Sequence, residues 1–205
     1  MHRITEEFEK ELCEYTGSKY ACCVDNASNG IYLALTYLGI KGKTIKLPNH
    51  TYMSVPCEVI LAGGKVEWTM NESKFLTGAY RLVPTPVWDS ALRFTADMFQ
   101  CGMYMVLSFT GPYKHLKLGK GGCIIHDDPN AVDWFKRARN SGRGECSYHE
   151  DTFKSIGRNC YMMPEIAARG LLLMKQFYNH DGSKKHNEDL TMPYPDLSKF
   201  EVYTK

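Results

Sequence analysis

The stretch of sequence that decides the fold spans residues 20–40 and reads YACCVDNASNGIYLALTYLGI. It opens with a short apolar run at residues 20–24, which is typical of a buried strand. A turn of polar and small residues follows at 25–30, and Ile31 and Leu35 then recur at helical spacing. The stretch therefore predicts a strand, a polar turn and a helix whose free backbone N–H groups lie at the turn.

A further helix and two more strands are predicted immediately downstream. Residues 44–47 and 65–68 have the pattern of short strands, and the segment between them predicts a helix that Pro56 kinks or delimits. This alternation indicates an α/β fold in which a mainly parallel sheet is covered by helices. Further helices are expected at about 5–17, 129–139 and 164–178, whereas residues 179–205 are polar and typical of a loosely packed tail.

The charge pattern excludes several classes of protein. The 205 residues include 25 Lys and Arg against 23 Asp and Glu, with both signs interspersed, so nothing marks a nucleic-acid or membrane surface. No apolar run approaches the length of a membrane span, and the acidic, amphipathic start is unlike a signal peptide. We therefore expect a soluble cytoplasmic protein.

The eight cysteines favour reduced thiols over disulfides or a metal site. Cys22 and Cys23 are adjacent within a predicted strand, and the chain contains no Cys-x-x-Cys pair. A zinc site built from Cys146, His149 and Cys160 would lack a second closely spaced pair of ligands. We therefore expect no metal.

The polar turn at residues 28–30 is a candidate phosphate site. A helix start presents free N–H groups and the positive end of the helix dipole, which together bind phosphate. The alternative is that Asn26 and Ser28 only cap the helix, which is the commoner case. A dinucleotide or nucleoside triphosphate is disfavoured, because the sequence has no Gly-x-Gly-x-x-Gly and no P-loop lysine.

A conspicuous lysine, Lys114, lies in the glycine-rich stretch 108–122 between two apolar runs that predict buried strands. Loops at strand ends often carry chemistry, although a lysine there is more often only solvated. His50 and Asp89 also follow apolar runs, at the kind of position where α/β sheets hold ligands. The alternatives are a surface histidine at position 50 and a helix cap at position 89.

Taken together, these stretches resemble the DegT-like (DegT/DnrJ/StrS) sugar aminotransferases, fold-type-I enzymes that use pyridoxal 5′-phosphate (PLP). Six pieces occur in the family's order, at residues 24–40, 48–66, 87–94, 108–127, 139–143 and 157–171. The resemblance implies a shortened PLP-binding large domain at 1–178. It also implies a polar tail, 179–205, in place of the family's C-terminal small domain.

Three residues would act on the cofactor ring if the resemblance holds. It implies that Lys114 forms the Schiff base with PLP and that Asp89 pairs with the pyridine nitrogen. A carboxylate there keeps the ring protonated and makes it a better electron sink. His50 stands where the family places an aromatic side chain that stacks on the ring.

The resemblance also implies contacts to the cofactor phosphate and across a dimer. Ser28, the backbone of Asn29 and the hydroxyl of Ser108 would hold the phosphate. Asn159 aligns with a residue that in relatives reaches the partner's cofactor. One departure is Leu92, which stands where the family usually has a Gln or His that hydrogen-bonds the ring hydroxyl.

The implied activity is transfer of an amino group from an amino acid such as glutamate to a ketosugar, usually nucleotide-linked in the family, by a homodimer. Lys114 would move the proton as general base and acid. Two alternatives stay open. One is a catalytically inactive PLP-fold remnant that acts as a binding or partner subunit, and the other is a PLP enzyme that performs decarboxylation or elimination.

Overall fold

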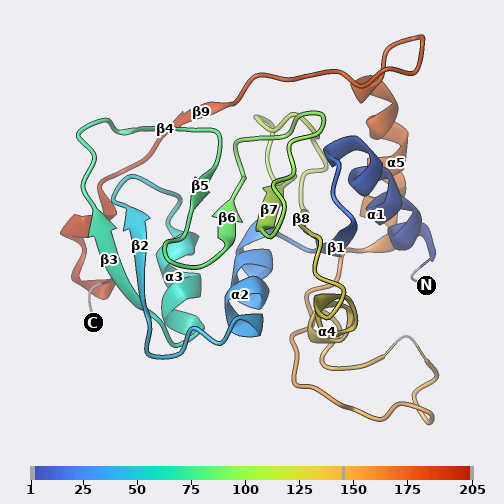
Figure 1. The fold of residues 1–205 in the computed structure, drawn as a ribbon, viewed down its shortest axis with the longest axis horizontal. Helices are drawn as coiled ribbons and strands as arrows, with labels where there is room; N and C mark the ends of the chain where they lie inside the picture. Colours follow the sequence, from blue (N-terminus) through green and yellow to red (C-terminus); the bar gives the residue numbers. More distant parts are fainter. Residues whose placement is uncertain (1–2, 145, 204–205) are drawn as a thin grey trace.

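The computed structural model describes residues 3–144 and 146–203 and shows a sheet between two groups of helices (Figure 1). The main sheet has five strands in the order β1, β8, β7, β6, β5. Their bounds, in that order, are Tyr20–Val24, Gly122–His126, Tyr104–Ser108, Val87–Asp89 and Tyr80–Arg81. The predicted α/β fold with a helix-covered sheet is confirmed.

The main sheet is mixed in direction. β6 and β7 pair in parallel, whereas β8 is antiparallel to both of its neighbours, β7 and β1. β1, β6 and β7 consequently run the same way, but three of the four pairings in this sheet are antiparallel, so the predicted mainly parallel sheet is corrected to a mixed one. β8 and β5 run against them, and this could not be predicted, because a short buried apolar run has the same pattern in either direction.

A second pair of strands continues this arrangement. β2 (Thr44–Pro48) and β3 (Lys65–Thr69) pair in parallel, and a bridge between Lys46 and Val83 joins β2 to the segment that follows β5. The connecting helix α3 (Ser54–Leu61) contains Pro56 as its third residue. A proline is tolerated there because the first turn of a helix needs no N–H bond, so Pro56 helps to delimit α3.

Helices cover both faces of the main sheet. α2 (Ala27–Tyr37), α3 and α4 (Ala131–Ala138) share one hydrophobic core with Val106 and Ile124. α1 (Arg3–Thr16) and α5 (Pro164–Met174) share a second core with Met105 and Ile125. Successive strand residues therefore point into opposite cores, as the pleat of a strand requires.

The segment after α5 runs back across the molecule (Figure 1). It passes through the 3₁₀ turn η1 (Lys175–Phe177) to β9 (Thr191–Pro193), which pairs antiparallel with β4 (Phe75–Thr77), and continues into η2 (Leu197–Lys199) and η3 (Glu201–Tyr203). Arg93 holds Asp189 through two hydrogen bonds of 2.9 and 2.6 Å, and Leu197 is buried. The prediction of a loosely packed tail was wrong, because the partners of this segment are distant in sequence.

The sequence predicts no disulfide, no metal site and no membrane-spanning segment, and the described residues bear on each of these. All eight cysteines lie among them and are free thiols. Residues 3–144 and 146–203 contain no group of three or more His, Cys, Asp or Glu side chains placed to hold a metal ion. In the same part of the chain, every helix is too short or too polar to cross a bilayer.

Candidate active site

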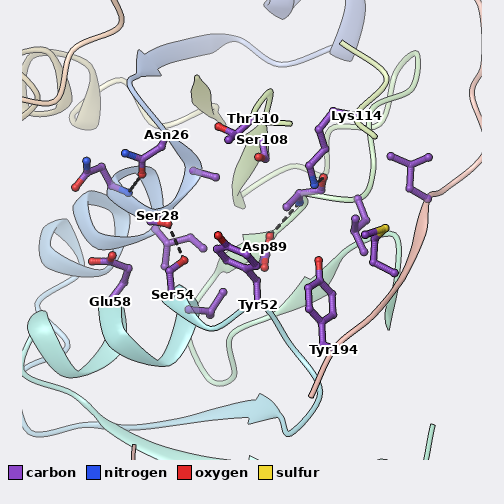
Figure 2. Close-up of a pocket in the computed structure, with 18 of the residues that line it drawn as sticks. Asn26, Ser28, Tyr52, Ser54, Glu58, Asp89, Ser108, Thr110, Lys114 and Tyr194 are labelled. Carbon is purple, nitrogen blue, oxygen red and sulfur yellow. Dashed lines mark hydrogen bonds between the residues drawn. The ribbon is translucent and has the colours of Figure 1, made fainter. Parts of the chain in front are cut away.

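A cavity of about 510 Å³ lies where several chain segments meet beside the main sheet (Figure 2). Its walls come from the starts of α2 and α3, the ends of β6 and β7, the loop that carries Lys114, and the C-terminal segment around β9. The ends of parallel strands are where open α/β sheets bind ligands. The polar lining side chains are Asn26, Ser28, Asn29, Tyr52, Ser54, Glu58, Asp89, Ser108, Thr110, Tyr113, Lys114 and Tyr194.

The loop that carries Lys114 is anchored by buried apolar residues on either side of it. Phe109 and Leu116 belong to the core shared with α1 and α5, and a bridge between Thr110 and Gly119 closes the base of the loop. Lys114 therefore remains on the cavity side, where its Nζ donates a hydrogen bond of 2.5 Å to the carbonyl oxygen of Ala91.

The electrostatic setting of Lys114 favours the neutral amine more than water does. Burial lowers the pKa of Lys114 below its ordinary value, and the negative charge of Asp89 opposes this effect. A larger fraction of the amine is therefore unprotonated near neutral pH than for a solvated lysine. An unprotonated amine is the form that can act as a nucleophile or a base.

Asp89 is the last residue of β6 and is 4% exposed. Its Oδ1 accepts a hydrogen bond of 3.0 Å from the backbone N–H of Ala91. Burial raises the pKa of Asp89, while that bond, a bond from Tyr80 and the charge of Lys114 act in the opposite direction. A buried carboxylate that faces a cavity in this way is suited to a cationic ring nitrogen, which would supply the counter-charge it lacks.

The start of α2 forms the other end of the cavity. Asn26 caps the helix by accepting a hydrogen bond of 2.8 Å from the N–H of Asn29. The hydroxyls of Ser28 and Ser54 are 2.6 Å apart, so two helix starts meet here. With Ser108 and Thr110, which also line the cavity, these serines form a group of four side chains that we call the hydroxyl cluster. Free helix N–H groups beside hydroxyls are a suitable site for a phosphate.

Five of the seven predicted site residues line this cavity, namely Ser28, Asn29, Asp89, Ser108 and Lys114. His50 and Asn159 are not among its lining residues. The ring Nδ1 of His50 is instead 2.8 Å from the carbonyl oxygen of Tyr194, so His50 fixes the C-terminal segment. Asn159 is exposed and forms a bridge with Asn140. The roles of all seven residues stay predictions.

Sequence reasoning missed three groups of lining residues. Tyr52, two residues after His50, is an aromatic side chain that lines the cavity, and its position shortly after the predicted strand at 44–47 could have indicated it. Ser54 and Thr110 lie beside predicted residues and had no distinguishing pattern. Contacts with residues that are distant in sequence bring Tyr194 to the cavity, so no local sequence pattern could predict its position there.

The fold is similar to that of solved structures of aminotransferases. A solved structure described as a PLP-dependent aminotransferase from Bacillus cereus matches with a TM-score of 0.68 at 20% identity, covering 84% of this chain and 58% of that one. Helicobacter pylori PseC, an aminotransferase involved in the biosynthesis of pseudoaminic acid, matches with a TM-score of 0.71 at 16% identity, covering 85% and 58%.

The sequence comparisons find similarity to one aminotransferase family. Residues 2–70 match the model of the DegT/DnrJ/EryC1/StrS aminotransferase family. The UDP-4-amino-4,6-dideoxy-N-acetyl-beta-L-altrosamine transaminase of Campylobacter jejuni serotype O:2 is 23% identical over 222 residues, which cover 87% of this chain and 58% of the relative. The resemblance found in the sequence is confirmed, and the chain spans less than two thirds of the length of this relative.

Proposed function

We propose that this chain is a PLP-dependent aminotransferase that transfers an amino group from an amino acid such as glutamate to a nucleotide-linked ketosugar. The observation that supports it most is that one cavity holds a half-buried lysine amine, a buried carboxylate and the hydroxyl cluster at a helix start. These three groups match the carbonyl, the ring nitrogen and the phosphate of PLP. The names of the sugar transaminase relatives support the substrate class.

The residues of the cavity fit the cofactor. Lys114 is the covalent anchor, Asp89 is the partner of the ring nitrogen, and the hydroxyl cluster with the N–H groups at the start of α2 holds the phosphate. Tyr52, at the cavity wall, offers an aromatic face to a planar ring. When bound, PLP supplies an electron sink for the carbanion that forms when a C–H proton is removed.

Lys114 is the residue that moves the proton in this proposal. Its pKa is lowered by burial, so the free amine can accept a proton at Nζ and return it to a neighbouring carbon. Asp89 stays in place beside it, because its Oδ1 accepts the hydrogen bond from the Ala91 N–H, and a cationic ring nitrogen would stabilise its charged form against the effect of burial. The same two side chains therefore serve both half-reactions, with the amino acid and the ketosugar as successive substrates.

The proposal includes a cytoplasmic homodimer in which Asn159 reaches the partner's site. The exposed position of Asn159 is compatible with such a contact. We also propose the division into a PLP-binding domain at 1–178 and a following polar segment. Sedimentation of PLP-loaded protein tests the assembly: a monomer with an intact cofactor site would remove the cross-subunit role of Asn159.

Cofactor attachment is tested by adding PLP to the purified protein, reducing with borohydride and measuring the mass of the intact chain and its peptides. We expect one PLP-sized adduct on the peptide that contains Lys114, and no adduct in Lys114→Ala. Lys114→Arg is the matched variant that keeps the charge. An unchanged adduct in Lys114→Ala would show that another amine is the anchor.

Turnover is tested separately with PLP-loaded protein and a panel of amino donors. Conversion of the bound cofactor to its amino form by glutamate is the expected result, followed by amination of a nucleotide-linked ketosugar detected by mass spectrometry. If PLP binds but no donor converts it to its amino form, the alternative of a catalytically inactive binding or partner subunit is favoured. Release of carbon dioxide would favour decarboxylation, and release of ammonia would favour elimination. Asp89→Asn is expected to abolish conversion while keeping the hydrogen bond from Ala91.

A further inference from the structure

The cavity has one wall that comes from the C-terminal segment, and Tyr194 is its most polar member. Leu190, Met192 and Tyr194 line the cavity from this segment. In Figure 2 the ring of Tyr194 stands beside Asp89, with its hydroxyl directed toward the cavity on the side where Lys114 lies. A tyrosine hydroxyl that faces a cavity can donate a hydrogen bond to an acceptor atom of a bound ligand.

The backbone around Tyr194 is held firmly in place. Its carbonyl oxygen is 2.8 Å from Nδ1 of His50, and its N–H donates to the carbonyl oxygen of Lys74 at 2.8 Å. The N–H of Leu197 donates to the carbonyl oxygen of Asn49 at 2.8 Å. These hydrogen bonds therefore hold the segment at Tyr194 and at Leu197, and the backbone that carries the Tyr194 side chain into the cavity is fixed.

The hydroxyl of Tyr194 makes no hydrogen bond with residues 3–144 and 146–203, although the backbone N–H and carbonyl oxygen of Tyr194 are both hydrogen-bonded. Burial raises the pKa of Tyr194 to about 12, and the charges of Asp89 and Tyr52 add to this effect. The hydroxyl therefore keeps its proton at neutral pH and is available to donate.

Leu92, whose carbonyl oxygen accepts a hydrogen bond of 2.8 Å from the N–H of Leu190 in this segment, offers no such donor. Leu92 is 2% exposed and lines the cavity three residues after Asp89. Its apolar side chain can pack against a ring but cannot hydrogen-bond an oxygen on it. An anionic oxygen in this part of the cavity would find a donor in Tyr194 and none in the side chain of Leu92.

The connectivity of PLP decides which oxygen this is. The carbon that carries the carbonyl lies opposite the ring nitrogen, and the phosphate arm and the ring hydroxyl flank it on opposite sides. With the nitrogen at Asp89, the carbonyl at Lys114 and the phosphate at the hydroxyl cluster, the ring hydroxyl faces away from that cluster. Figure 2 shows Tyr194 on the far side of Asp89 from Ser28 and Ser54.

We infer that Tyr194 donates its hydroxyl proton to the ring oxygen of the cofactor and thereby sets the basicity of the site. This inference rests on the proposed function, because it requires that PLP binds in this cavity. Tyr194 is a positioning and tuning residue from a segment that the sequence alone marks as a tail. It supplies the hydrogen bond that Leu92 cannot.

The test is a pH titration of the visible absorption of the bound cofactor in the wild type, Tyr194→Phe and the control Tyr203→Phe. Tyr203 belongs to the same C-terminal segment, but its ring packs on Trp68 and does not line the cavity. Removing a hydrogen-bond donor from an anionic ring oxygen makes the protonated form of the bound cofactor more favourable. We expect the titration midpoint of Tyr194→Phe to rise by about one to two pH units, the effect of one hydrogen bond to a charged group.

A second variant tests the mechanism of that shift. Leu92→Gln in the Tyr194→Phe background places an amide donor at another lining position of the cavity, and the midpoint is expected to return toward the wild-type value. The PLP dissociation constant, measured by fluorescence titration, is expected to rise about tenfold or more in Tyr194→Phe and to stay unchanged in Tyr203→Phe.

The outcomes separate the two proposals. If the wild type binds PLP but Tyr194→Phe titrates as the wild type does, the role of Tyr194 is refuted and the proposed function stands. If Tyr203→Phe shifts the midpoint as far as Tyr194→Phe does, the effect is a general loosening of the segment and the inference also fails. If the wild type forms no PLP chromophore, the proposed function itself is wrong.

Discussion

The close approach of Gly122 to the start of α2 gives a sharp prediction about both stability and cofactor binding. A Cβ atom at Gly122 would lie 2.6 Å from the backbone nitrogen of Ala27 and 2.7 Å from the carbonyl carbon of Asn26. Both atoms are backbone, so no side chain can rotate away. Gly122→Ala must therefore push the capped turn of α2 away from β8.

The expected size of the effect follows from the two consequences of that displacement. Overpacking of this kind lowers the free energy of unfolding by about 1–3 kcal/mol. A shifted turn also loses alignment with the phosphate, and one lost hydrogen bond to a charged group weakens binding by about 10- to 100-fold. We expect both changes in Gly122→Ala.

The assay is urea unfolding without PLP, followed by a PLP titration under native conditions. Gly170→Ala is the matched control, because its Cβ would lie 2.6 Å from the ring of Phe8 in the other core, and Gly170 does not line the cavity. It is expected to lower stability with less than a twofold effect on PLP affinity. Wild-type PLP affinity in Gly122→Ala would refute the assignment of the α2 start as the phosphate site.

Two further predictions concern stability. Arg139 is 1% exposed and donates hydrogen bonds to Glu9 and to the carbonyl oxygen of Cys23, so Arg139→Met is expected to lower the free energy of unfolding by about 3–5 kcal/mol, with partial recovery in Glu9→Gln/Arg139→Met. Chemical denaturation measures this, and an equal loss in the double variant would contradict the unpaired-charge explanation. His126 is 1% exposed, and burial lowers its pKa to about 4. The unfolded chain therefore binds the proton first as pH falls, and stability drops by about 3 kcal/mol between pH 7.5 and pH 4. In His126→Phe, we expect the free energy of unfolding to lose most of this decrease between pH 7.5 and pH 4. An unchanged dependence of the unfolding free energy on pH would show that other groups cause it.

Local patterns predicted the first half of the fold well. β1 matches its predicted bounds, because polar and small residues bracket the apolar run on both sides. α2 begins at Ala27 because Asn26 caps it, and the same cap places the predicted phosphate site. These features depend on neighbours in the sequence, so the sequence is sufficient to find them.

The missed features depend on contacts between distant segments. The reversed direction of β8 is set by its pairing with β1 and β7, which its own residues do not encode. His50 and Tyr52 both follow β2 closely, and only the packing of the C-terminal segment against His50 decides which one faces the cavity. Tyr194 could be found only from the folded arrangement.

The C-terminal wall also has a consequence for the order in which the protein matures on the ribosome. The α2 turn, Asp89 and Lys114 are all translated before Tyr194, so a nascent chain can build three sides of the cavity while the fourth is still missing. A cavity that is open in this way leaves the lysine amine more exposed to water. Under the proposed function, stable capture of the cofactor therefore requires that the segment with β9 has first paired with β4.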